Sequence, residues 1–237
     1  TNALMARNIS LYRALGYTVE GEAGQPGAVA VRMRKAVARR LVFLPGAAGS
    51  ASFWRPLGER LPAHWKKTYL SWPGLGFEAH APQVRGMDDL VRLVESAVGD
   101  GPADLLAQSM GGVPALAFAL GHPGRVRRLV LTATSGGVDA AARAAALHDW
   151  RASYRRNYPL AADWIRLDRT DLTDRLAQVA APTLLLFGDA DPIAPPFVGK
   201  RLAELLPNAT LHVLPGAGHD LAALRPEAAD LAYDHLR

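Results

Sequence analysis

The sequence predicts an α/β protein with a doubly wound, mostly parallel sheet. Six short, nearly continuous apolar runs are separated by segments long enough to hold a helix, a pattern typical of strands covered on both faces. Of the 237 residues, 49% are hydrophobic and 21% are charged, as in ordinary globular proteins. A chain of this length buries roughly 70 to 75% of its unfolded surface, so we expect a large core without disulfides.

The first part of the chain predicts an antiparallel hairpin. Tyr17 and Val19 fall in one strand, and residues 29–33 alternate between apolar and polar side chains in the next. The residues between them, 21–27, include glycine and proline and are expected to form the turn.

The six apolar runs that follow are the predicted strands of the parallel sheet. They comprise residues 40–44, 68–70, 103–107, 128–132, 183–187 and 210–214. Helical patterns such as residues 198–206 separate them, as parallel strands require.

Residues from about 137 to 180 exceed the length that one crossover helix needs. Residues 139–156 combine helix-forming alanines with apolar positions at helical spacing. The pair Tyr158-Pro159 interrupts this pattern, and residues 160–167 resume it. We therefore expect a core domain of residues 1–136 and 181–237 with a small helical cap, residues 137–180, inserted in it.

Charge and composition exclude several classes of protein. The 27 Lys and Arg residues exceed the 22 Asp and Glu residues, but the densest basic stretch, residues 32–40, overlaps the hairpin alternation and is better explained as a solvated strand edge than as a nucleic-acid site. The absence of cysteine excludes a thiol nucleophile and a cysteine-ligated metal. No apolar run reaches 18 residues and no signal pattern is present, so we expect a cytoplasmic protein without a membrane span.

The strongest chemical signal is the sequence LLAQSMGG at residues 105–112. A buried strand runs into a helix through Ser109, which has the small residues Ala107 and Gly111 two positions away on each side. This pattern indicates a nucleophile elbow, a strained turn that exposes the serine hydroxyl. The alternative is a serine that caps a helix packed through its glycines.

A serine nucleophile requires a base and a carboxylate that orients the base. Asp189 and Asp191 follow the strand at 183–187, and His219 follows the strand at 210–214. Catalytic groups of open α/β sheets collect at the carboxyl ends of the strands. The pattern therefore predicts a site that contains Ser109, His219 and one of the two aspartates.

With these motifs, residues from about 41 to 236 resemble the α/β-hydrolase family, and in particular its small, cap-bearing, esterase-like serine hydrolases. The sequences LVFLPGAAGSASFW at 41–54, PGLG at 73–76 and GDADPI at 188–193 resemble the family's first oxyanion loop, its PGxG turn and its acid loop. The chain order Ser, Asp, His is also that of the family. Two departures are Pro45, where the family usually has histidine, and Ser71-Trp72, where an acidic residue often precedes the turn.

The resemblance implies the α/β-hydrolase fold and a role for each site residue. The acid immediately before proline is the triad member, which favours Asp191 over Asp189, with Asp139 as an alternative because some members place their acid there. The backbone N–H groups of Ala47 and Met110 would form the oxyanion hole.

A substrate would lie between the sheet edge and the cap. The predicted pocket residues are Ala48, Trp72 and Gln108 below and Trp150, Tyr154 and Trp164 above, although aromatic residues at helical spacing often pack a cap onto a core instead. The arginines at positions 143, 151, 155, 156, 166 and 169 of the cap would hold a carboxylate-rich substrate, dock an acyl carrier protein, or form a solvated face.

The predicted reaction is hydrolysis of a small-molecule carboxylic ester or thioester through an acyl-enzyme, with no cofactor and no metal site. A non-hydrolytic enzyme that uses the same triad, such as a carbon-carbon lyase or a synthase, is one alternative. A hydrolase-like receptor that turns its ligand over slowly is another. The sequence leaves the acyl chain, the leaving group and the oligomeric state open.

Overall fold

The computed structural model describes residues 3–14, 17–25, 28–35, 39–138 and 150–237, which form two compact units, Thr1–Arg39 and Arg40–Arg237. The first unit contains helix α1 (Ala3–Ala14) and strands β1 (Tyr17–Gln25) and β2 (Ala28–Lys35). The strands pair antiparallel, which confirms the hairpin. The turn is shorter than predicted, because residues 21–25 continue β1 after a register shift between Val19 and Gly21. Helix α1 was not predicted, since its apolar residues follow no clear helical stripe.

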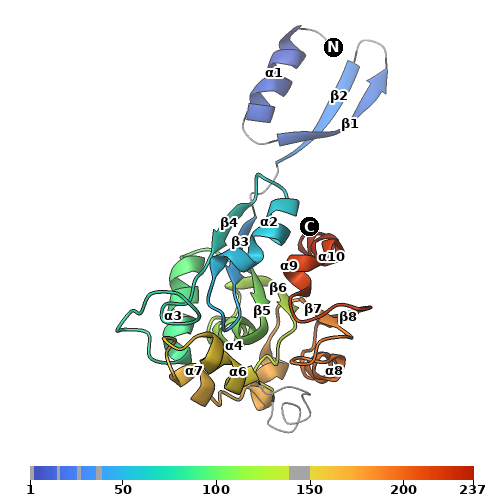
Figure 1. Ribbon diagram of the computed structural model, residues 1–237. Coiled ribbons are helices and arrows are strands. Elements are labelled where there is room, and N and C mark those ends of the chain that lie inside the picture. Colours follow the sequence, from blue (N-terminus) through green and yellow to red (C-terminus); the bar gives the residue numbers. More distant parts are fainter. Residues whose placement is uncertain (1–2, 15–16, 26–27, 36–38, 139–149) are drawn as a thin grey trace. The chain divides into compact units, whose positions relative to one another are not determined.

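The second unit contains the predicted parallel sheet. Its strands are β3 (Arg40–Leu44), β4 (Lys66–Tyr69), β5 (Ala103–Gln108), β6 (Val126–Thr132), β7 (Thr183–Gly188) and β8 (Ala209–Leu214). They lie in the order β4-β3-β5-β6-β7-β8, and each neighbouring pair is parallel (Figure 1). Each of the six apolar runs therefore forms a strand, as the sequence predicts.

Helices cover both faces of this sheet. They are α2 (Arg55–Arg60), α3 (Met87–Val98), α4 (Gly112–Gly121), α8 (Pro196–Leu205), α9 (Leu221–Leu224) and α10 (Pro226–Leu236). Helix α4 packs against α3 and contacts β5 and β6, whereas α10 packs against α2 and contacts β6 and β7. The sheet is thus doubly wound. Among the described helices, none has both the length and the apolar composition to cross a bilayer.

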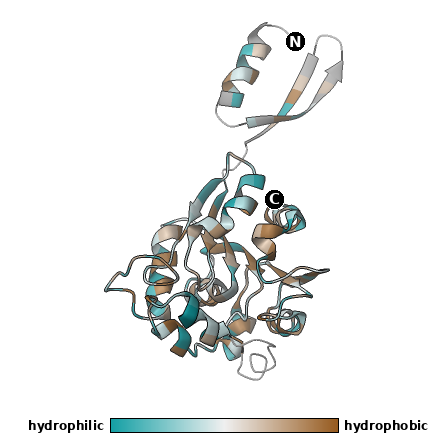
Figure 2. Cartoon of the chain, in the orientation of Figure 1, coloured by the Kyte–Doolittle hydropathy of each residue, from teal (hydrophilic) through white to brown (hydrophobic). Residues whose placement is uncertain are grey.

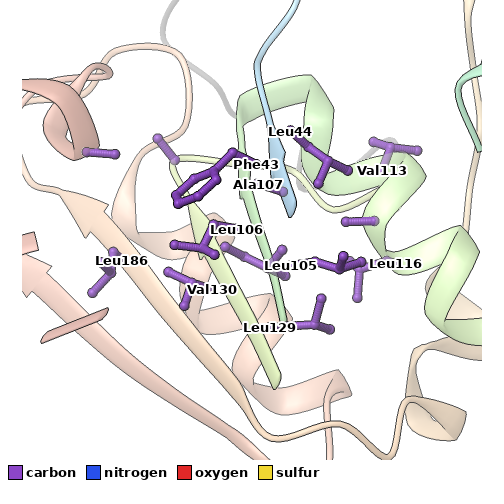
Figure 3. Packing of buried hydrophobic residues seen from close by; sticks show 14 of the residues in the cluster. Phe43, Leu44, Leu105, Leu106, Ala107, Val113, Leu116, Leu129, Val130 and Leu186 are labelled. Atoms are coloured by element: carbon purple, nitrogen blue, oxygen red, sulfur yellow. The ribbon is translucent and has the colours of Figure 1, made fainter. Parts of the chain in front are cut away.

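The core lies on the two faces of the central strands. Every residue of β5 is buried, and hydrophobic residues follow the central strands in Figure 2. In Figure 3, Leu44, Leu105 and Leu129 point toward Leu116 of α4, on one face of the sheet. The buried side chains of Phe43, Leu106, Val130 and Leu186 lie on the other face. This dense packing makes the sheet a rigid support for the loops at its carboxyl edge.

The chain changes direction between two central strands. It passes from β3 to β4 at one edge of the sheet and then returns to β5 on the other side of β3. The loop after β3 leads to α2 and the turn after β5 leads to α4, which cover different faces. A crevice forms where such loops diverge, and ligands of open α/β sheets bind there.

The segment between β6 and β7 contains α6 (Trp150–Asn157), α7 (Trp164–Leu167) and the 3₁₀ helix η3 (Thr173–Gln178). The predicted first helix, residues 139–156, lies partly outside the described residues. The second helix is shorter than predicted: residues 160–163 form a turn after Pro159, and α7 begins at Trp164. The division into a core and an inserted cap at residues 137–180 remains our proposal.

Candidate active site

Ser109 lies in the turn between β5 and α4, in the 3₁₀ helix η2 (Ser109–Gly111). Its φ angle of +53° falls in the left-handed region, which side chains with a Cβ rarely adopt. A Cβ at Gly111 would lie 2.4 Å from the carbonyl oxygen of Pro45, so only glycine fits there. The capping position of η2 is Gln108, not Ser109. The structure therefore contradicts the alternative of a helix-capping serine.

The turn at Ser109 has a partner on the neighbouring strand. The Thr134 hydroxyl, two residues beyond the end of β6, donates a hydrogen bond to the Ser109 carbonyl. The same hydroxyl oxygen accepts the Gly136 N–H at 3.0 Å. Thr134 was not predicted, and its one sequence signal is that it lies two residues after a central strand.

A row of hydrogen bonds joins Ser109 to the loops after β7 and β8. The Ser109 hydroxyl oxygen lies 2.9 Å from Nε2 of His219. On the other side of the ring, Nδ1 of His219 lies 2.8 Å from Oδ2 of Asp191. These residues are separated by 82 and 28 positions in the sequence, and the parallel sheet brings them together at one edge.

Asp191 is buried, and both of its carboxylate oxygens take part in hydrogen bonds. The N–H groups of Ile193 and Ala194 donate to Oδ1 at 2.8 and 3.1 Å, which leaves Oδ2 for His219. Burial raises the pKa of Asp191, but the hydrogen bond from His219 and those two N–H groups outweigh it, so that the pKa lies below its ordinary value. The carboxylate is therefore ionised and only accepts hydrogen bonds.

The other two candidate acids do not meet His219. Asp189 is exposed, and its Oδ1 accepts the N–H of Gly216 at 2.6 Å, which joins the loops after β7 and β8. Asp139 lies outside the described residues. Within the described part of the chain, Asp191 is thus the carboxylate in contact with the imidazole.

A cavity of about 170 Å³ opens beside Ser109 and His219. Its walls come from the loop after β3, the turn after β5, helix α6 and the loops after β7 and β8. They comprise Pro45, Gly46, Ala47, Ala48, Ser50, Phe53, Gln108, Ser109, Trp150, Ile193, His219 and Asp220. The loops after β3 and β5, which diverge at the crevice described above, thus form part of the cavity wall.

The structure divides the predicted pocket residues into two groups. Ala48, Gln108 and Trp150 line the cavity, whereas Trp72, Tyr154 and Trp164 do not. Trp72 and Tyr154 are buried, and their polar atoms bind main-chain groups of neighbouring loops. The prediction of these two side chains as pocket walls is therefore wrong, because long-range hydrogen bonds direct them into the protein.

Six further cavity residues were not predicted: Pro45, Gly46, Ser50, Phe53, Ile193 and Asp220. Each lies in a motif quoted from the sequence or next to a predicted site residue. The first four belong to the motif at 41–54, Ile193 follows Asp191-Pro192, and Asp220 follows His219. Their positions in or beside the motifs could have predicted that these residues lie near the site, but not that they line the cavity.

The predicted oxyanion groups belong to the loop after β3 and to the turn after β5. Ala47 lines the cavity, and its N–H has no acceptor within the described part of the chain. Met110 directly follows Ser109 in η2, and its side chain is buried. Pro45, which stands where the family usually has histidine, accepts a hydrogen bond from the Trp72 indole at 2.7 Å through its carbonyl oxygen.

An open parallel sheet with a serine, a histidine and a carboxylate in one hydrogen-bonded row at its carboxyl edge is the architecture of a large class of α/β proteins. A comparison with known families agrees: residues 41–229 match the alpha/beta hydrolase family. Because the match covers most of the chain, the chain belongs to the alpha/beta hydrolase family.

Relatives of known name are similar over most of their length. The pimeloyl-[acyl-carrier protein] methyl ester esterase of Neisseria meningitidis serogroup B (strain H44/76) is 28% identical, over 76% of this chain and 86% of the relative. A 2-hydroxy-6-oxononadienedioate/2-hydroxy-6-oxononatrienedioate hydrolase of Burkholderia vietnamiensis is also 28% identical, over 74% and 77%. Among solved structures, a thermophilic esterase from Thermogutta terrifontis superposes with a TM-score of 0.67 at 24% identity, over 84% of this chain and 89% of that one. This last likeness supports the fold.

Proposed function

We propose that the protein is a serine hydrolase that cleaves a carboxylic ester or thioester through an acyl-enzyme. The observation that carries this proposal is the row of hydrogen bonds from Ser109 through His219 to Asp191, beside a cavity. Family membership and relatives named as hydrolases and an esterase support it.

The hydrogen bonds define where the protons lie. An ionised Asp191 accepts only, so Nδ1 of His219 donates to it. In the neutral ring, Nε2 then carries a lone pair, and the Ser109 hydroxyl donates to it. His219 takes the serine proton as the oxygen attacks the carbonyl carbon, and returns it to the leaving alcohol or thiol. A water molecule, activated by the same imidazole, then releases the acyl group from Ser109.

The negative charge that develops on the carbonyl oxygen needs hydrogen-bond donors. We assign the N–H groups of Ala47 and Met110 to this role. The N–H of Ala47 is free of other acceptors in the described part of the chain and belongs to a cavity residue. One well-aimed donor contributes about 3 to 4 kcal/mol at the transition state.

The substrate would contact Ala48, Gln108 and Trp150. Ala48 and Trp150 offer apolar surface, whereas Gln108 is the polar member of this group. Oε1 of Gln108 would lie 2.2 Å from a Cβ at Gly46, so its amide lies against the loop after β3. This amide makes no hydrogen bond within the described residues and is available to a polar group of the substrate.

Of the predicted cap arginines, Arg143 lies outside the described residues, and most of the others contact the cap itself. Arg166 donates to Asp163 at 2.8 Å, Arg155 lies 3.7 Å from the same carboxylate, and Arg151 donates to the Arg166 carbonyl. These contacts favour a structural role over a docking site for an acyl carrier protein. A salt series tests this: KM for a carrier-bound substrate should rise with ionic strength, and KM for a neutral ester should not.

Labelling with a fluorophosphonate, followed by p-nitrophenyl esters of increasing acyl length, tests the proposed function. Ser109→Ala should abolish labelling and lower kcat by about four to six orders of magnitude, because the nucleophile is lost. Ser96→Ala, on helix α3 away from the cavity, is the matched control and should leave both unchanged.

The same experiment separates the alternatives. Ester turnover by Ser109→Ala near the wild-type rate would disprove the assignment of the nucleophile. A burst of p-nitrophenol without further turnover would indicate a receptor, and labelling without hydrolysis of any ester or thioester would indicate non-hydrolytic chemistry at the same triad.

A further inference from the structure

The loop after β3, residues 45–51, is held in place by side chains from outside it. The Trp54 indole donates at 2.9 Å to the carbonyl of Leu44, the last residue of β3, directly before the loop. The Trp72 indole donates to the Pro45 carbonyl at 2.7 Å. The Tyr154 hydroxyl donates to the Ala47 carbonyl at 2.8 Å. Two of these donors come from the core, and the third comes from helix α6.

The loop has few side-chain groups that could form hydrogen bonds with its own backbone. Its sequence is PGAAGSA, and Ser50 is its one residue with a polar side chain. The Ser50 hydroxyl is hydrogen-bonded to the Ser52 hydroxyl at 2.8 Å. Pro45 has neither the side-chain donor of the family's usual histidine nor a backbone N–H. The Gly49 N–H donates to the Gly46 carbonyl, but the donors to the carbonyls of Pro45, Ala47 and Gly49 come from other parts of the chain.

Tyr154 joins three segments through one oxygen atom. Its hydroxyl donates to Ala47 and accepts the Gly76 N–H at 2.9 Å, so α6 contacts both the loop after β3 and the turn after β4. The side chain is 6% exposed. Burial raises the pKa of the Tyr154 hydroxyl, which keeps its proton and remains a donor.

Two hydrogen bonds restrain the backbone on either side of Ala47. The peptide unit before Ala47 is held by the hydrogen bond from the Gly49 N–H to the Gly46 carbonyl at 3.0 Å. The peptide unit after Ala47 is held by Tyr154. With both flanking peptide planes held, the two backbone dihedrals of Ala47 have little freedom, and its N–H keeps one orientation beside Ser109.

We propose that Tyr154 is a positioning residue that couples the position of helix α6 to the geometry of the oxyanion hole. The inference rests on the proposed function, because it assigns Tyr154 a task in ester hydrolysis. Tyr154 does not line the cavity and acts through the Ala47 peptide unit. Without its hydroxyl, the Ala47 N–H samples other orientations, and transition-state stabilisation falls while ground-state binding remains.

Tyr154→Phe tests this coupling, and Tyr158→Phe is the matched control. The Tyr158 ring lies 4.9 Å from the Tyr154 ring, and its hydroxyl has no hydrogen-bond partner among the described residues. Tyr154→Phe should lower kcat about 10-fold with KM unchanged, less than the loss of a direct oxyanion donor. It should weaken inhibition by a boronic acid, which forms a tetrahedral adduct, by a similar factor. Tyr158→Phe should leave all three within twofold.

Hydrogen exchange of the peptide covering residues 45–54 provides a readout that needs no substrate. Exchange should be faster in Tyr154→Phe and unchanged in Tyr158→Phe. Replacement of Tyr154 by p-aminophenylalanine, whose amine can still donate, should restore slow exchange and kcat, and it covers the case in which Tyr154→Phe folds poorly. Unchanged exchange, equal effects of both phenylalanine variants, or a change in KM without a change in kcat would overturn the proposal. If the wild-type protein hydrolyses no ester, the proposed function fails, and the exchange result alone decides whether Tyr154 holds the loop.

Discussion

Two buried carboxylates lie at opposite ends of the same sheet. Asp104 is at the amino end of β5, and Asp191 is in the loop after the carboxyl end of β7; neither side chain is exposed. Nε and Nη2 of Arg127 donate to the two oxygens of Asp104 at 2.9 and 2.6 Å, so each carboxylate oxygen accepts a hydrogen bond from the guanidinium. Asp191 instead holds an imidazole that reaches Ser109 and a cavity.

The difference shows what distinguishes a candidate site from a structural ion pair. Both aspartates are buried and both are compensated, so burial of a charge by itself marks neither. The Arg127 fork uses both oxygens of Asp104. The loop after β7 satisfies one oxygen of Asp191 with backbone N–H groups and leaves the other for His219. The two carboxylates therefore differ in their partners: His219, which binds Asp191, lines the cavity, and Arg127, which binds Asp104, does not. Substitutions at the two ends of the sheet should have different effects.

The largest effect is expected for Asp191→Asn. The asparagine amide would donate to Nδ1 of His219, which places the imidazole proton on Nε2, where it can no longer accept the serine proton. We expect kcat to fall about 10⁴-fold, with the fold retained. Steady-state kinetics on a p-nitrophenyl ester measures this loss.

Asp189→Asn is the control for that change. Its amide oxygen can still accept the Gly216 N–H, so kcat should stay within a few-fold of the wild type. If Asp191→Asn kept kcat within tenfold of the wild type, the orienting acid would have to be another residue, and Asp139 would be the next to replace.

At the other end of the sheet, Arg127→Met should change stability and not catalysis. Removal of the guanidinium takes two hydrogen bonds and a positive charge from the buried Asp104 carboxylate. Because Arg127 is 32% exposed, we expect about 3 kcal/mol of lost unfolding free energy, at the low end for buried pairs. Urea denaturation followed by tryptophan fluorescence measures it, since all five tryptophans lie in residues 40–237. The double variant with Asp104→Leu should recover most of the loss, and no recovery would contradict this account.

Apolar runs predicted the strands well except where charged residues lie at the start of a strand. Strand β5 is buried throughout and was predicted to within one residue. Strand β4 begins at Lys66, two residues before its predicted start, because it lies at the edge of the sheet, where lysines are tolerated and no apolar signal exists. Strand β6 likewise begins two residues before its predicted start, at Val126, because Arg127 and Arg128 interrupt its apolar run. An apolar run therefore shows where a strand is but not where its charged first residues begin.

The same limit applies to the candidate site. Motif order predicted that Ser109, His219 and Asp191 would meet, and their side-chain atoms lie within hydrogen-bond distance. The destinations of Trp72 and Tyr154 could not be predicted, since helical spacing shows which residues share a face but not which distant carbonyl a hydroxyl or indole will meet. Tyr154 and Ala47 are 107 positions apart, and no local pattern records their contact.

The smallest effect concerns the dependence of stability on acid. The pKa of Asp191 in the folded protein lies below its ordinary value of 3.8. Its contribution to stability is therefore fully present above that value and is lost as the pH falls through the lower, folded-state pKa. The wild type should be more stable than Asp191→Asn at pH 7, by about 1 to 2 kcal/mol for hydrogen bonds to a charged group, and this difference should shrink below pH 4. Urea denaturation of both proteins from pH 7 to pH 3 tests the sign, and comparing the two cancels the titration of the other carboxylates. A difference that grew as the pH fell would mean that Asp191 is held protonated in the folded protein, in which case Nδ1 of His219 would not need to donate to it and the proton assignment between Asp191 and Ser109 would be wrong.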